Sequence, residues 1–209
     1  MKHFYVTIAL FFAAATFQGC SLSSLLGGKP GTPTRLYTLS TRACTQSHTN
    51  PQFQKSLIVD TTRGASLIDR ATIAFTRAPG EWGFYQFATW AALPTEMFTS
   101  SLLANLDCSG LFRQVSRGYG LTNADFFLAT EIVSFFHDAT VFPEVAVVIV
   151  RADLVPTENR DRSVTTVFRS TVPLSASNSG AAVAALNEGV DNVMVQMLSW
   201  IESSVAAKH

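Results

Sequence analysis

The sequence has little charge and no excess of either sign. Charged residues make up 14% of the 209 residues, and 15 Lys and Arg balance 15 Asp and Glu. A chain without a positive excess exerts no long-range attraction on phosphates, which argues against a nucleic-acid partner. Hydrophobic residues make up 47% of the chain, and this content is ample for the core of a single domain.

Motifs of catalysis and cofactor binding are also missing. The sequence contains no G-x-S-x-G, no H-E-x-x-H and no P-loop. The G-Y-G at residues 118–120 is only a fragment of a dinucleotide-binding pattern, so it is interpreted as a turn. His48, His137 and His209 stand in no motif with a carboxylate or a nucleophile, and each is interpreted as a solvated surface residue. We therefore expect no enzymatic activity and no cofactor.

The apolar run over residues 4–17 is too short for a transmembrane helix, which needs about 20 residues. Behind a basic start, and ahead of a small residue, the run has the anatomy of a secretory signal. F-Q-G-C at residues 17–20 resembles the bacterial lipobox, whose cysteine is lipidated and becomes the first mature residue. The sequence thus predicts a signal peptide over residues 1–19 and lipidation of Cys20. An ordinary secretory signal followed by an incidental cysteine is the alternative.

Cysteine is scarce, and Cys20, Cys44 and Cys108 are the three in the chain. No C-x-x-C and no Cys/His cluster occurs, so the sequence does not support a metal site. Lipidation of Cys20 leaves Cys44 and Cys108 as an even pair. In the oxidising compartment of an exported protein, such a pair predicts one disulfide. Two buried free thiols are the alternative.

The rest of the chain divides into a tether and one domain. Residues 20–34 begin with the lipidated cysteine, continue with many Ser, Gly and Pro and show no periodicity, as is typical of a flexible tether. Fully extended, this segment reaches about 50 Å, enough to hold a folded domain clear of a membrane surface. Residues 35–206 carry the hydrophobic patterns of a folded domain.

Two segments of this domain have helical periodicity. Apolar residues recur every three or four positions over residues 94–107 and 179–205, which predicts two main helices. Pro94 suits a first helical turn, Gly110 supplies a stop, and Asn178 is a credible N-cap.

The other segments predict strands. They lie near residues 35–40, 56–60, 72–76, 82–87, 111–116, 126–136, 145–150 and 164–172. We interpret the third and fourth as one hairpin and the last two as another. The expected fold is therefore a single α+β domain, with a largely antiparallel β-sheet packed against the two helices.

Two of the strands have informative side-chain patterns. Residues 145–150 are apolar at every position, as in a central strand that is buried on both faces. Alternation along residues 126–136 predicts two apolar faces, one with Phe126, Leu128, Ile132 and Phe136 and the other with Phe127, Ala129, Val133 and Phe135.

The densest aromatic run covers residues 82–90. Packing in the core and in a turn is its simplest interpretation. The alternative is that outward members form a surface that contacts a protein partner or lipid, because Tyr and Trp suit interfaces. The candidates for this surface are Trp82, Phe84, Tyr85 and Trp90.

Several segments also carry a family resemblance. They are L-Y-T-L at 36–39, F-Y-Q-F-A-T-W-A-A-L-P at 84–94, S-G-L-F-R-Q-V at 109–115, A-D-F-F-L at 124–128, F-R-S-T-V-P at 168–173 and A-A-V-A-A-L-N-E at 181–188. In this order they resemble the ABC-type transport auxiliary lipoproteins, the PqiC/YmbA-like family. The resemblance extends over almost the whole predicted domain.

The resemblance implies a non-enzymatic lipoprotein of a diderm bacterial envelope. Such a protein works beside an MCE-domain protein in an MCE/ABC-type system that moves phospholipids between the inner and outer membranes. The resemblance also admits a ring-shaped homo-oligomer. Ser21, and not Asp, follows Cys20, which indicates an outer-membrane address with the domain in the periplasm. The alternative is a free-standing outer-membrane lipoprotein for ligand binding or envelope assembly, without a transporter partner.

Overall fold

The computed structural model describes residues 34–39, 50–118 and 123–207. The predicted signal peptide, Cys20 and Cys44 lie outside these residues.

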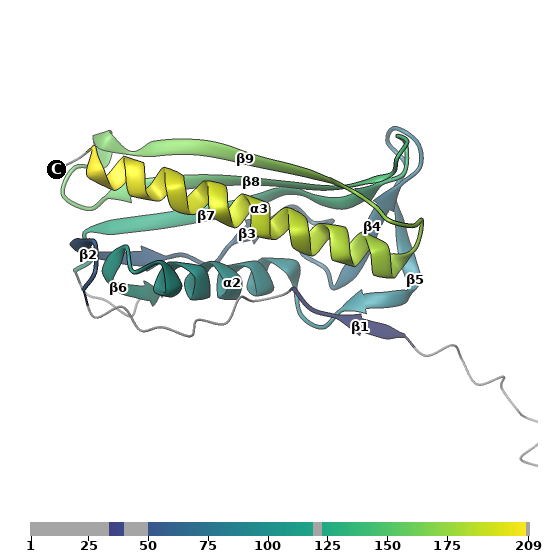
Figure 1. Cartoon of the computed structure of the whole chain (residues 1–209), viewed down its shortest axis with the longest axis horizontal. Helices are drawn as coiled ribbons and strands as arrows, with labels where there is room; N and C mark the ends of the chain where they lie inside the picture. The colour runs from purple at the N-terminus through teal and green to yellow at the C-terminus, as the bar shows by residue number, and fades with distance from the viewer. Residues whose placement is uncertain (1–33, 40–49, 119–122, 208–209) are drawn as a thin grey trace, which may run out of the picture. The chain divides into compact units, whose positions relative to one another are not determined.

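β7 (Phe126–Asp138) is the strand around which the sheet is built (Figure 1). Along one edge it pairs antiparallel with β8 (Val145–Pro156), and β8 pairs antiparallel with β9 (Val164–Pro173). These are the two longest ladders of the sheet. A short 3-10 helix, η2 (Arg160–Arg162), lies in the turn between β8 and β9. The hairpin predicted from the last two apolar runs is confirmed.

The other edge of β7 is shared by three strands that are parallel to it. β2 (Phe53–Val59) pairs with the beginning of β7, β3 (Arg63–Gly64) with its middle and β4 (Thr72–Thr76) with its end. Each of these strands pairs with only part of the long β7. Because β2 and β4 each pair with a further strand, the sheet divides into two branches at this edge.

One branch continues from β2 to β6 (Phe112–Arg117), which is parallel to it. The other continues from β4 to β5 (Gly83–Trp90), the second predicted hairpin, and then to β1 (Arg35–Tyr37), which is parallel to β5. The sheet is therefore mixed and mostly antiparallel. Together with two helices it forms one α+β domain, as predicted.

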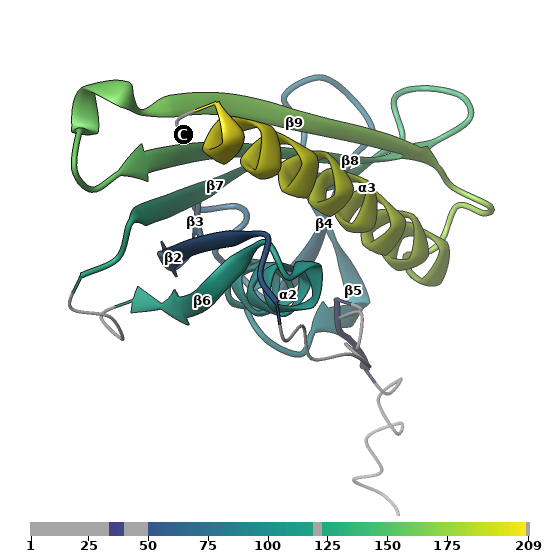
Figure 2. The same cartoon turned by 60° about the vertical axis from the view of Figure 1, so that its left-hand side comes forward.

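Both helices lie on the same face of the sheet (Figures 1 and 2). α2 (Pro94–Ser109) has Pro94 in its first turn and ends at Gly110, whose φ of 63° is the left-handed conformation that glycine adopts without strain. α3 (Ser179–Ala206) begins at Asn178, whose side chain accepts a hydrogen bond from the backbone N–H of Ala181. The two helices predicted from the sequence are confirmed, with Pro94, Gly110 and Asn178 in the predicted end positions.

The core lies between the helices and the covered face of the sheet. α3 packs on β8 and β9 along its length. The backbone of α3 comes close to β8 at Gly189, where an added Cβ would lie 2.7 Å from Cγ2 of the buried Val148. A glycine is therefore needed there for packing, because a methyl group has no room.

A β-bulge in β7 reverses the predicted faces of its last residues. The register with β8 shifts between Ile132 and Ser134, so Val133 is an extra residue. Phe135 is buried as a result, and Phe136 lies on the opposite face. The prediction that placed Phe136 with Phe126 and Phe135 with Phe127 is wrong, because strict alternation cannot indicate a bulge.

Candidate functional site: the open face of the sheet

The face of the sheet opposite the helices is apolar over much of β8. Side chains alternate between the two faces of a strand, so every second residue points away from α3. Val148 and Val150 are fully buried beneath the helix, whereas Val147 and Ile149 on the other face are half-buried. The prediction that residues 145–150 are buried on both faces is wrong, because no helix covers the second face within the described part of the chain.

Aromatic and aliphatic side chains of neighbouring strands continue this apolar surface. Trp82, just before β5, packs against Phe136 of β7, with ring centroids 4.9 Å apart and an interplanar angle of 80°. Trp82 is 42% exposed, Phe84 37% and the bulge residue Val133 48%. We call this surface the open-face patch and define it by Trp82, Phe84, Val133, Phe136, Val147 and Ile149.

Two of the four aromatic residues predicted to form a contact surface point to the covered face instead. Trp90 is 2% exposed and packs against Phe135, so the prediction of a surface role is wrong for Trp90. Tyr85 is half-buried and stacks on His137. For Tyr85 the cause is alternation, since it follows Phe84 directly in the strand. For Trp90 the cause is irregular pairing, because four residues of β5 lie opposite Ile73 alone between two registered pairs. The surface role of Trp82 and Phe84 stays a prediction.

At the end of β7, three hydrogen-bonded polar side chains lie at the border of the covered face. His137 is 2% exposed, and its Nδ1 lies 2.9 Å from the Tyr85 hydroxyl. Its Nε2 lies 2.8 Å from Oε2 of Glu144. Burial raises the pKa of Tyr85, the charge of Glu144 raises it further, and Arg77 opposes both.

The burial of His137 corrects its interpretation as a solvated surface residue. Its two partners come from β5 and from the far side of the β7–β8 turn, so no local sequence signal links them. With both ring nitrogens occupied, the imidazole is held as a structural group. His48 and His209 lie outside the described residues.

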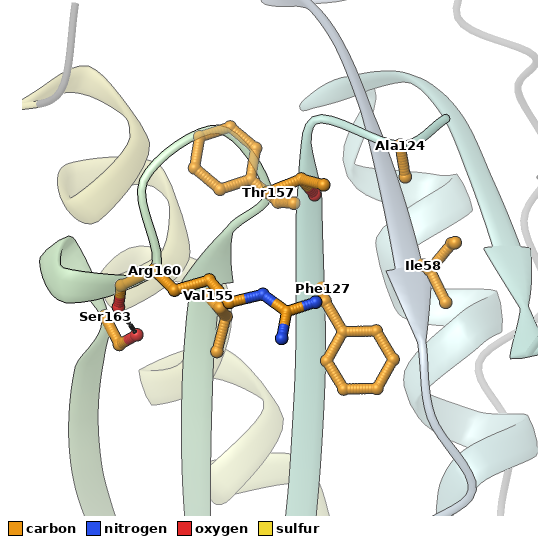
Figure 3. A pocket seen from close by; sticks show the side chains of 8 residues that line it. Ile58, Ala124, Phe127, Val155, Thr157, Arg160 and Ser163 are labelled. Atoms are coloured by element: carbon orange, nitrogen blue, oxygen red, sulfur yellow. Dashed lines mark hydrogen bonds between the residues drawn. The ribbon is translucent and has the colours of Figure 1, made fainter. Parts of the chain in front are cut away.

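A pocket of about 520 Å³ lies at the other end of β7 and β8 (Figure 3). Its walls are mostly apolar, with Ile58 of β2, Phe127 of β7 and Val155 of β8. The Arg160 side chain extends from η2 across Val155 toward Phe127 (Figure 3). No sequence pattern indicated this pocket, because its lining comes mainly from three strands and η2, which are spread along the chain between residues 53 and 162. The lining residues are Ile58, Ala124, Phe126, Phe127, Val155, Thr157, Arg160 and Ser163.

The strand ends beside this pocket are joined by a carboxylate. Oδ2 of Asp125 accepts hydrogen bonds from the backbone N–H and the hydroxyl of Ser56, both at 2.8 Å, and Lys55 Nζ lies 3.1 Å from Oδ1. Desolvation by burial acts to raise the pKa of Asp125. The Ser56 hydrogen bonds and the Lys55 charge outweigh it, so this pKa is lowered.

The predicted covalent sites are only partly within the described residues. Cys108 lies near the end of α2 and is disulfide-bonded. Because Cys44 lies outside the described residues, its pairing with Cys108 stays a prediction, and so does the lipidation of Cys20. Across residues 34–39, 50–118 and 123–207, none of the helices has the length and apolarity to span a bilayer.

The fold is thus that of a two-helix α+β domain with one open sheet face, and family comparison identifies it further. The model of the ABC-type transport auxiliary lipoprotein component matches residues 37–198. The chain belongs to this family. No curated protein is significantly similar to it in sequence.

Solved structures share the fold. A Xanthomonas campestris protein of family DUF330 superposes with a TM-score of 0.72 and 23% identity, covering 83% of this chain and 98% of that one. An uncharacterized protein has a TM-score of 0.64 and 12% identity, with 81% and 99% covered. A hypothetical protein from Chlamydia trachomatis has a TM-score of 0.51 and 11% identity, with 74% and 99% covered.

Proposed function

We propose that this protein is a lipid-anchored, non-enzymatic accessory of an MCE/ABC-type system that moves phospholipids between the inner and outer membranes. The observation that carries the proposal is the family match over residues 37–198, since the family is an auxiliary lipoprotein component of ABC-type transport. Cys20, behind a secretory signal, is the anchor, and Ser21 directs it to the outer membrane. The domain then lies in the periplasm.

The open-face patch is the proposed docking surface for an MCE-domain protein of that system. Exposed apolar patches of this kind mark interaction sites in soluble domains. Arg151 and Asp153 border the patch on β8 and form an ion pair at 3.2 Å. This ion pair places charged side chains beside the apolar centre of the patch. Interfaces between proteins have the same anatomy of apolar core and polar rim.

Co-purification from native membranes tests this proposal. The full-length protein is recovered in mild detergent as the wild type, as Trp82→Ala and as Val195→Ala. Val195 is the matched control, because it is 62% exposed but lies on α3, away from the patch. An MCE-domain protein should accompany the wild type and Val195→Ala, and Trp82→Ala should lose it while retaining the wild-type thermal unfolding midpoint.

Failure to recover any MCE-domain or ABC-transporter subunit with the wild type would contradict the transport role. Loss of the partner with Val195→Ala as well would remove the patch from the proposal but leave the role. Sedimentation of the same detergent extracts measures whether the protein forms the homo-oligomeric ring that the family resemblance admits.

The anchor has its own test. Metabolic labelling with a fatty acid should label the wild type and leave Cys20→Ser unlabelled. A labelled Cys20→Ser variant, or an unlabelled wild type, would contradict the lipoprotein assignment.

A second candidate function, a free-standing outer-membrane lipoprotein that binds a ligand, is favoured by the pocket beside Arg160. Apolar walls with one guanidinium suit an amphiphile that carries an anionic group. Native mass spectrometry of the purified wild type and of Arg160→Ala tests it. A bound anionic amphiphile that is lost in the variant, from a protein without transporter partners, would favour this candidate.

A further inference from the structure

The turn between β7 and β8 holds a fully exposed aromatic side chain. Phe142 is 99% exposed, and the preceding Val141 is 46% exposed. Among the residues that the structure describes, the other exposed large apolar side chains keep at least part of their surface against neighbours. The Phe142 ring gains nothing from folding, because it is as exposed to water as in the unfolded chain, so its burial free energy is available to a contact outside the domain.

The turn itself is well fixed at its base. The Asp138 carboxylate accepts hydrogen bonds from the backbone N–H and the hydroxyl of Thr140, at 2.9 and 2.6 Å. The Ala139 N–H donates to the Thr76 carbonyl at 2.9 Å, and the carbonyl of Glu144 accepts from Leu174 at 2.8 Å. Phe142 is therefore held away from the domain by a supported turn.

A second turn with apolar residues lies beside it. The last residues of β4 and β7 are in register, Thr76 with Asp138, so the β4–β5 turn and the β7–β8 turn leave the sheet at the same end (Figure 1). Trp82, at the base of the β4–β5 turn, is 42% exposed. The same end therefore presents two exposed aromatic rings, and Phe142 is the more exposed of the two.

The chain also enters the domain at this end. In Figure 1, β1 begins at the end of the long axis where the two turns lie, while α3 finishes at the opposite end. The segment from Cys20 to residue 34 reaches at most about 50 Å. A bilayer that holds lipidated Cys20 is thus within reach of the turns.

We propose that the β7–β8 turn inserts Phe142 into the interface of the bilayer that anchors Cys20, with Trp82 at the edge of the contact. This inference rests on the lipid anchor of the proposed function. A narrow turn with one fully exposed ring suits a lipid surface, whereas a protein partner needs about 800 Å² on each side. Aromatic side chains are the usual anchors at the level of the lipid headgroups.

The charges near the turn indicate which force drives the insertion. Residues 138–144 contain Asp138 and Glu144 and no Lys or Arg, and the neighbouring β4–β5 turn adds Arg77 and Glu81. The two turns together therefore carry no net positive charge that could attract anionic lipid. Insertion is driven by the apolar ring, so it should not require anionic lipid and should not be weakened by salt.

Fluorescence quenching by brominated lipid tests the insertion. The lipidated mature chain carries Phe142→Trp or, as the matched control, Val195→Trp, each in a Trp82→Phe background. Trp90 and Trp200 remain in both proteins, so their emission is recorded with the Trp82→Phe protein alone and subtracted. Both sites are exposed, so neither substitution disturbs the core. The proteins are reconstituted into phosphatidylethanolamine/phosphatidylglycerol vesicles with plain or dibrominated acyl chains. The tryptophan at 142 should lose most of its emission in brominated vesicles, at low and high salt alike, and the one at 195 almost none.

The outcomes separate this inference from the proposed anchor. If the protein sediments with vesicles but the tryptophan at 142 is quenched no more than that at 195, the insertion is refuted and the anchor stands. If the protein does not sediment with vesicles, the lipid anchor fails and the inference fails with it. A blue shift at 142 without quenching by lipid indicates a protein contact, which also refutes insertion.

Discussion

β7 and β8 carry apolar side chains on both faces, but α3 covers only one face. On the covered face, Leu128, Ile132 and Val148 are at most 1% exposed. On the open face, Phe136 and Ile149 are half-buried. Burial accounts fully for the apolar residues under the helix, but only in part for those on the open face, which keep some contact with water. The comparison indicates that one face stabilises the domain and the other is available for docking.

The sharpest way to break this comparison is a matched pair of Ile→Ala substitutions. Ile132→Ala removes a side chain that is 1% exposed, so it should lower the free energy of unfolding by about 2–5 kcal/mol. Ile149→Ala, on the open face of the adjacent strand, should cost about 1 kcal/mol or less, because its side chain is only half-buried. Urea unfolding of both variants measures the difference. Equal losses would mean that the two faces are packed alike.

A second test adds a methyl group beneath α3. Gly189→Ala should destabilise the domain by about 1–3 kcal/mol, because the new Cβ would lie 2.7 Å from Val148 Cγ2. Helix propensity works in the opposite direction, since Ala is favoured over Gly by about 1 kcal/mol inside a helix. A double-mutant cycle with Val148→Ala isolates the contact. If the cost of Gly189→Ala persists when Val148 is shortened, the close approach is not its cause.

A third test concerns the hydrogen-bonded polar side chains at the border of the covered face. Tyr85→Phe removes the hydroxyl that bonds His137, at a cost of about 1 kcal/mol. Because the folded-state pKa of Tyr85 is raised above 10.0, the wild type favours the neutral phenol. That contribution is complete below pH 10 and is lost as pH rises through the raised folded pKa.

The variant should therefore lose less stability than the wild type when urea unfolding is compared below and above pH 10. Parallel alkaline profiles for the two proteins would show that Tyr85 titrates alike in the folded and unfolded states.

The smallest effect on stability is expected at the bulge. Val133→Thr keeps a β-branched side chain on an exposed position, so the free energy of unfolding should change by less than about 0.5 kcal/mol. If the open-face patch binds an MCE-domain protein, the same variant should nevertheless recover less of that partner from native membranes. A large loss of stability would show that the open face contributes to the fold.

Local patterns in the sequence were sufficient for the two helices and the two hairpins. Their signals lie within a few residues of the elements that they define, as with Pro94 and Gly110 at the ends of α2 and Asn178 at the start of α3. The apolar run over residues 145–150 was also recognisable as a strand, but not the fact that only one of its faces is covered. Whether a face is covered depends on where α3 packs, and the residue pattern of a strand carries no information about that.

The candidate site was predicted less completely for the same reason. The aromatic run over residues 82–90 was found, but alternation placed Tyr85 on the face opposite Trp82 and Phe84, and irregular pairing with β4 turned Trp90 toward the core. The strands β2, β3 and β4 follow one another along the chain, but all three lie far before β7, with which they pair in parallel. Their partners are selected by tertiary contacts and not by their own alternation.

The amino-acid sequence by itself determined the two helices, every strand of the described residues except the two-residue β3, the α+β class and the family, because periodicity, end signals and ordered motifs are local properties. Tertiary structure alone decided which apolar residues are covered. The extra residue Val133 moved Phe135 into the core and Phe136 beside Trp82, and the β7–β8 turn left Phe142 exposed. Exposure is a property of the packed molecule, since it depends on what lies opposite each side chain.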